Sequence, residues 1–195
     1  YATSTDPEDY GNGTADMTGQ MDWGYNYSLG RPGIYYGSGR TTLSWRTLTI
    51  AEWQYLLGNS ASRNGKWGYA RIDKGGAYVY GLIILPDSYD PDDDEDLAIV
   101  PGTLNTKSLT VWSNMESDGA IFLPACGIIN STRDHVNSIG YSGYYWSATH
   151  DDVDAAMAIS FTSNGSLSIN TNASYERHVG LSVRLVTEDG AESAL

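Results

Sequence analysis

The sequence predicts an α+β domain in which short strands outnumber helices. Glycine is frequent, at 22 of 195 residues, and charged residues make up only 18%. Two short stretches have the apolar spacing of a helix, whereas several others are apolar throughout or alternate with a period of two. Because no linker divides these stretches, we expect one domain over residues 1–195, with a polar arm at 1–20 and a frayed tail at 187–195.

The first helix is predicted from Ile50 to about Leu57. Thr49 is followed three residues later by Glu52, and this capping box satisfies two backbone N–H groups at a helix start. Gly58 then ends the helix. The apolar face of the helix comprises four residues: Ile50, Trp53, Leu56 and Leu57.

A second helix is predicted from Val111 to about Asp118. Thr110 is its expected N-cap, because a hydroxyl can accept a hydrogen bond from the first turn. Val111, Trp112 and Met115 are expected to face the core, and Gly119 ends the helix.

Four other segments read as strands. Residues 81–86 and 119–124 are apolar runs that both end in Leu-Pro, where proline stops ladder pairing, and we expect buried strands there. Residues 157–161 and 181–185 alternate between large apolar and small or polar side chains, which predicts half-buried antiparallel strands. The polar stretch between these two, residues 162–178, contains an Asn-Gly turn signal.

The charge balance excludes some partners. The formal net charge is −13, so a nucleic-acid backbone and anionic lipids would be repelled. No window is long and apolar enough for direct membrane insertion. The chain begins at Tyr1 rather than Met, and we expect that a preceding export signal has been removed.

No catalytic motif is found, and we expect no enzyme activity. Residues 140–143 (Gly-Tyr-Ser-Gly) are one residue too short for a nucleophile elbow, and phosphate-loop and zinc-protease motifs are missing. His135, His150 and His178 are scattered through polar segments. Cys126 follows an apolar run, and we expect a small buried thiol rather than a nucleophile.

The acidic run from Asp87 to Asp96 is the best candidate for metal binding. Calcium binds clustered carboxylates, but this run lacks the spacing and the glycine of an EF-hand loop. We therefore expect a solvated loop and no cofactor, with calcium binding as the alternative.

Five motifs follow one another along the chain. They are residues 45–53 (Trp-Arg-Thr-Leu-Thr leading to Glu-Trp), 81–86 (Gly-Leu-Ile-Ile-Leu-Pro), 119–125 (Gly-Ala-Ile-Phe-Leu-Pro-Ala), 143–149 (Gly-Tyr-Tyr-Trp-Ser-Ala-Thr) and 180–186 (Gly-Leu-Ser-Val-Arg-Leu-Val). Over roughly residues 22–186, this series resembles the major paralogous domain first noted in Fibrobacter and abundant in surface proteins of Bacteroidetes.

The resemblance implies a C-type-lectin-like fold, related to formylglycine-generating enzymes and to the variable proteins of diversity-generating retroelements. It implies fold-holding roles for Trp146, Gly180 and Arg184. Family members often have an early strand before the Trp-Gly segment at Trp23, and we expect that strand to be missing here. The sugar-binding motifs of animal C-type lectins are absent, and Cys126 has no second cysteine beside it, so neither calcium-dependent sugar binding nor formylglycine chemistry carries over.

Together these features predict a non-enzymatic ligand-binding or adhesin module, extracellular or on a bacterial cell surface, for example at a pilus tip or on a lipoprotein. Its ligand would be a surface protein or a glycan, and a retroelement-diversified receptor is a special form of this hypothesis. The alternatives are a structural subunit of a surface assembly and a degenerate or glycan-acting enzyme.

The predicted binding face lies on two polar segments between the C-terminal strands, because loops on a rigid frame commonly carry binding residues. Its predicted ligand-binding residues are His150, Asp151, Asp152, Asp154, Asn170, Asn172, Tyr175, Glu176, Arg177 and His178. We expect both segments to be loops with exposed side chains. The aromatic segment 23–36 is the alternative face.

Overall fold

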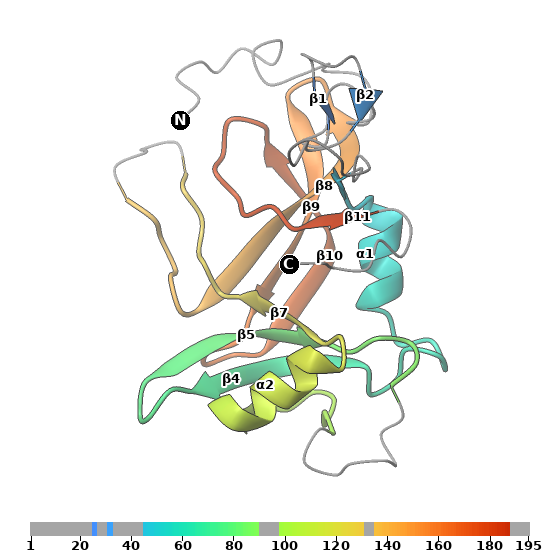
Figure 1. Ribbon diagram of the computed structural model, residues 1–195. Coiled ribbons are helices and arrows are strands. Elements are labelled where there is room, and N and C mark those ends of the chain that lie inside the picture. The colour runs from blue at the N-terminus through green and yellow to red at the C-terminus, as the bar shows by residue number, and fades with distance from the viewer. Residues whose placement is uncertain (1–24, 27–30, 33–44, 90–97, 131–134, 188–195) are drawn as a thin grey trace.

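The computed structural model describes residues 25–26, 31–32, 45–89, 98–130 and 135–187 (Figure 1). Within these residues the chain forms two short helices and eleven strands, and all strand pairs but one are antiparallel, in an α+β architecture. A four-stranded sheet has the order β6-β4-β5-β7. Its strands are β4 (Trp67–Asp73), β5 (Tyr78–Ile84), β6 (Asn105–Ser108) and β7 (Ile121–Pro124).

The two apolar runs form β5 and β7, which confirms both strand predictions. They pair with each other, with Gly81 opposite Pro124 and Ile84 opposite Ile121. Successive side chains of β5 point to opposite faces of the sheet, and both faces are covered, so the strand is apolar along most of its length. β5 begins three residues earlier than residue 81, because its Tyr78–Tyr80 segment pairs with β4 beyond the end of β7.

Helix α2 (Leu109–Ser117) covers one face of this sheet, where Trp112 and Met115 are buried as predicted. The helix starts two residues before the predicted Val111, and its N-cap is Ser108 rather than Thr110. Ser108 Oγ accepts a hydrogen bond from the Val111 N–H at 3.2 Å. Ser108 ends strand β6, so its backbone is already extended, as an N-cap requires.

Helix α1 (Ile50–Leu56) lies toward the other face and is the predicted helix. Its capping box between Thr49 and Glu52 is present, and Trp53 and Leu57 are buried. The ring of Trp53 lies 6.3 Å from that of Tyr145 on strand β8. This helix therefore joins the four-stranded sheet to the C-terminal strands through one continuous core.

The C-terminal strands form a three-stranded sheet in the order β10-β9-β8. These strands are β8 (Ser142–Asp152), β9 (Ala155–Thr162) and β10 (Ser168–Glu176), and Figure 1 shows the β8–β9 hairpin extending away from the four-stranded sheet. Strand β9 confirms the strand predicted at 157–161. Ile159 and Phe161 of this strand enter the core that contains Trp53.

Strand β10 corrects the expectation of a loop between Asn170 and His178. Most of that segment is an edge strand in which only Ala173 is buried, and a bulge interrupts its pairing with β9. An edge strand with one solvated face needs no row of large apolar side chains. The segment therefore lacks the hydrophobic pattern that would have identified it.

The end of the described chain runs beside β8. Ser182 exchanges two backbone hydrogen bonds, with Tyr144 and Trp146, both at 2.9 Å. Strand β11 (Leu185–Thr187) then pairs with β3 (Trp45–Thr47). The strand predicted at 181–185 is thus regular only at its last residue, because the preceding residues contact β8 through a single bridge.

Two further short strands, β1 (Tyr25–Asn26) and β2 (Arg31–Pro32), pair with each other. The expected polar arm at 1–20 lies outside the described residues, as does the expected tail after residue 187. Most of the aromatic segment 23–36 lies outside them as well.

Candidate functional site

The structure brings the two predicted polar segments together at one end of the three-stranded sheet. In the last row of the sheet, Asp152 of β8 and Glu176 of β10 pair with the same residue of β9, Ala155. In the next row, His150 and Tyr175 flank Ala156. We call this group the hairpin-end cluster, and it comprises His150, Asp151, Asp152, Asp154, Tyr175, Glu176, Arg177 and His178.

Asn170 and Asn172, which were also predicted to bind ligand, lie away from this cluster. Asn170 pairs with Ser160 and lines a small hollow of about 130 Å³ beside Tyr144. The Asn172 side chain faces helix α1, where it accepts a hydrogen bond from Gln54 Nε2 at 3.5 Å. The structure therefore unites eight of the ten predicted residues.

Three aromatic side chains pack together at and next to the hairpin-end cluster. The Tyr175 ring meets Trp146 edge-on, with ring centroids 6.4 Å apart, and meets Tyr144 in the same way at 5.8 Å. All three side chains are half-buried. Such edge-to-face contacts hold aromatic rings in fixed orientations. Tyr175 therefore lies in the sheet with its ring packed against two aromatic neighbours, and the expectation of an exposed loop residue is wrong.

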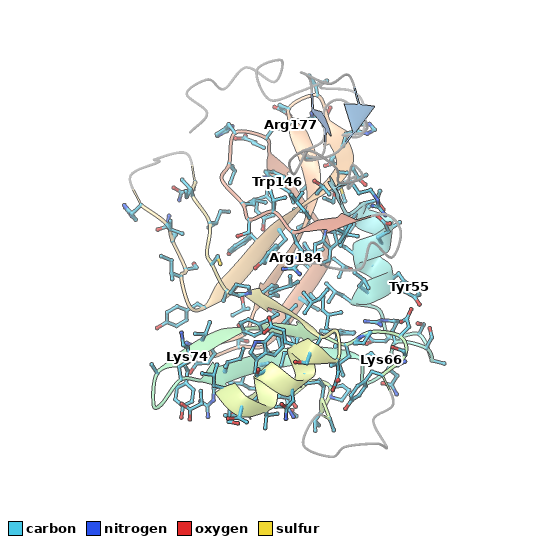
Figure 2. The ribbon with its side chains drawn as sticks, viewed as in Figure 1. Tyr55, Lys66, Lys74, Trp146, Arg177 and Arg184 are labelled. Carbon is cyan, nitrogen blue, oxygen red and sulfur yellow. The ribbon has the colours of Figure 1, made fainter. Side chains whose placement is uncertain are left out.

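The basic members of the cluster are also less exposed than expected. The Arg177 Nε donates to the Ala155 carbonyl at 3.2 Å, and its backbone N–H donates to the Asp154 carbonyl at 2.8 Å. The His178 side chain is only 12% exposed, and its Nε2 lies 3.3 Å from Glu176 Oε2. Figure 2 shows Arg177 at the end of the sheet, with Trp146 below it.

The acidic members face solvent. Asp151, Asp152 and Asp154 are exposed, and so is Glu176. Asp152 Oδ1 accepts a hydrogen bond from the next backbone N–H, that of Val153, at 2.7 Å. The cluster therefore presents exposed carboxylates at the end of the hairpin, beside the row that contains the half-buried Tyr175.

The three residues expected to hold the fold differ in their surroundings. Trp146 packs on Tyr175 as described, and Gly180 exchanges two backbone hydrogen bonds with Ile129. A Cβ on Gly180 would lie 2.9 Å from the Ile129 Cβ, so a side chain there would force the two segments apart. Arg184 is exposed, and its positive charge opposes the rise that burial causes in the pKa of Tyr145.

The expectation of a buried Cys126 is wrong, because its side chain is exposed. The chain leaves β7 just before this residue. Ala125 and Gly127 on either side of it are the buried positions, so the alternation of the extended backbone turns the thiol outward.

Only the beginning of the acidic run lies in the described chain. Asp87 is held by Arg63 Nη1 at 2.7 Å and by the Tyr55 hydroxyl at 3.0 Å, and the hydrogen bond from Arg63 lowers the pKa of Asp87. The acidic residues from Asp90 to Asp96 fall outside the described residues. Elsewhere in the described chain, no three His, Cys, Asp or Glu side chains are grouped so that they could hold a metal ion.

Arg63 is a buried charge that the sequence did not reveal. It is 1% exposed, and its guanidinium donates to the carbonyl oxygens of Leu56 and Leu85 as well as to Asp87. Arg63 stands in a polar turn beside Ser62 and Asn64, a context typical of solvated side chains. No local pattern could have identified it.

Comparison with known families gives one match. Residues 105–186 match the model of a family described as a domain of unknown function (DUF8237), and this region includes β6 to β10 and the hairpin-end cluster. No curated protein and no solved structure matches the chain. Neither described helix has the length and apolar character to cross a membrane. The chain is therefore similar over residues 105–186 to a family whose function is unknown.

Proposed function

We propose that this chain is a non-enzymatic ligand-binding module of C-type-lectin-like fold, displayed outside a bacterial cell, that recognises a surface protein or a glycan through the hairpin-end cluster. One observation carries the proposal. Two polar segments separated by about twenty residues of sequence are held on either side of strand β9, which pairs antiparallel with both β8 and β10. A surface fixed in this way loses little conformational entropy when it binds.

The composition of the cluster supports recognition. The cluster contains a half-buried aromatic residue, Tyr175, and the exposed carboxylates of Asp151, Asp154 and Glu176. Recognition surfaces commonly combine an aromatic centre with a polar rim. Carboxylates accept hydrogen bonds, so the favoured partners carry donor groups, such as the hydroxyls of a glycan or the basic side chains of a protein.

The surroundings of the carboxylates favour binding over catalysis. General acids and nucleophiles of glycan hydrolysis work as facing pairs in partly desolvated clefts. Asp151, Asp152 and Asp154 are instead consecutive or nearly consecutive residues at the exposed end of a hairpin. This arrangement supports a hydrated contact surface.

The proposal of a C-type-lectin-like fold rests on the ordered motifs. The residues of these motifs form α1, β5, β7, β8 and the segment that reaches β11, and most of these elements contribute to one core. A resemblance in fold depends on motifs that, like these, build the core together.

The test is a binding screen with a matched pair of variants. The labelled domain is applied to arrays of glycans and extracellular proteins, and the affinity for each hit is then measured for Asp151→Asn/Asp154→Asn/Glu176→Gln and for the control Glu116→Gln on α2. We expect the triple variant to weaken binding by about tenfold or more and the control to leave it unchanged. A ligand that binds the folded triple variant as tightly as the wild type would contradict the proposed face.

A further inference from the structure

A second concave site lies at the start of β4, outside the hairpin-end cluster. It is a pocket of about 350 Å³, at the lower end of the range of about 300–1,000 Å³ found for small-molecule sites. It is lined by Asn59, Asn64, Gly65, Trp67, Tyr69, Pro101 and Gly102. Figure 2 shows Lys66, which directly precedes Trp67, at the opposite end of the molecule from Arg177.

The polar groups of this pocket are not used by the fold. Within the described chain, the side-chain amides of Asn59 and Asn64 and the hydroxyl of Tyr69 make no hydrogen bond. Asn59 and Asn64 are exposed, and Tyr69 is 6% exposed as a whole residue. The unpaired amides and hydroxyl are therefore available to a ligand in the pocket.

The walls of the pocket are aromatic. The rings of Trp67 and Tyr69 stand edge-to-face, with centroids 6.0 Å apart and planes 68° apart. Trp67 uses its indole N–H for a 2.9 Å hydrogen bond to the Gly58 carbonyl, so the ring presents its apolar surface rather than its donor. The pocket therefore combines flat apolar surface with groups that both donate and accept hydrogen bonds.

Charge narrows the choice of ligand. None of the described lining residues is Lys, Arg, Asp, Glu or His, so none of them offers a basic partner to an anion or a carboxylate to a cation. The net charge of −13 further disfavours anions. Neutral rings that bear several hydroxyls match amide partners and aromatic walls, because their hydroxyls donate and accept while their C–H faces pack on flat rings.

We propose that the pocket formed by Asn59, Asn64, Trp67 and Tyr69 binds a neutral saccharide unit. The site is preorganised, since the loop that carries both asparagines is fixed at one end and near its middle. Trp67 holds Gly58 at one end, and the buried Arg63 ties the middle of the loop to the Leu56 and Leu85 carbonyls. This site is independent of the hairpin-end cluster, and each proposal can fail without the other.

Solution NMR of the ¹⁵N-labelled protein tests the site directly. The probes are glucose, galactose, mannose and N-acetylglucosamine, with glucuronic acid and glucosamine as the anionic and cationic counterparts. We expect at least one neutral sugar to shift the Trp67 indole N–H and the Asn59 and Asn64 amide signals in a saturable way. The Asn59→Ala/Asn64→Ala variant should weaken that binding by about tenfold or more with an unchanged Tm, because neither amide supports the fold.

Two controls separate this site from the first. The Tyr69→Phe variant should weaken sugar binding while keeping the ring, and Asp151→Asn/Asp154→Asn/Glu176→Gln should leave it unchanged. The proposal is overturned if no neutral sugar shifts these signals, if the charged sugars bind as well as the neutral ones, or if the double asparagine variant binds as tightly as the wild type. It is also overturned if the sugar-induced shifts arise at the hairpin end.

Discussion

Replacing Arg63 by Met tests whether its buried guanidinium ties the end of α1 to the end of β5. Arg63 Nε and Nη2 donate to the Leu56 carbonyl at 3.2 and 3.0 Å, and Nη1 donates to the Leu85 carbonyl at 3.1 Å. Leu56 is the last residue of α1, and Leu85 directly follows β5. Met keeps a long, unbranched side chain in this place but has no donor.

The expected loss of stability follows from the carbonyl groups that the substitution leaves without a donor. The part-buried carbonyl of Leu56 and the buried carbonyl of Leu85 would lose their side-chain donors, and each unsatisfied group costs about 1–3 kcal/mol. The variant no longer has to bury a charge, which offsets part of that loss. We therefore expect Arg63→Met to lower the free energy of unfolding by about 3 kcal/mol.

Urea unfolding followed by tryptophan fluorescence measures this change as a lower midpoint at an unchanged m-value. The matched control is Arg71→Met on β4, where the guanidinium bonds Thr106 at 2.9 Å and lies 4.3 Å from the Tyr78 ring at the surface. That variant should lose no more than about 1 kcal/mol. Equal losses in the two variants would refute the assignment of Arg63 as a buried clamp.

Three further predictions concern the core, the helix start and metal. Trp53→Ala should cost about 3–5 kcal/mol because the side chain is 1% exposed, and a loss below about 1 kcal/mol would mean that α1 is peripheral. Hydrogen bonding to Arg46 lowers the pKa of Glu52 to about 2. As the pH falls from about 4.5 towards 2, the wild type should therefore lose stability relative to Glu52→Gln. The expected loss is about 1 kcal/mol, because the carboxylate is partly exposed. Thermal melts with calcium and with chelator should superimpose, and a calcium-induced rise of many degrees would assign a site to residues 87–96.

Local signals in the sequence were sufficient for the elements whose cause is local. The capping box at Thr49 and Glu52 predicted where α1 begins, since the N-cap and the third helical residue complete it between themselves. The apolar runs predicted β5 and β7, because strands with both faces covered need continuous apolar sequence. The cap of α2 was wrong because Ser108 and Thr110 have equivalent hydroxyls, and only the preceding strand decides which backbone is extended.

Tertiary structure decided where the polar residues lie. The sequence predicts a loop where β10 lies, because an edge strand with a solvated face has no hydrophobic pattern. The pairing of β10 with β9 places Glu176 in the same row of the sheet as Asp152. The burial of Arg63 and the pocket at Trp67 depend in the same way on segments far apart in sequence. Residue types and local spacing determine the helices and strands whose cause is local, such as α1, β5 and β7. Strand register and packing between distant segments determine which polar side chains meet, and neither is encoded in any short window of the chain.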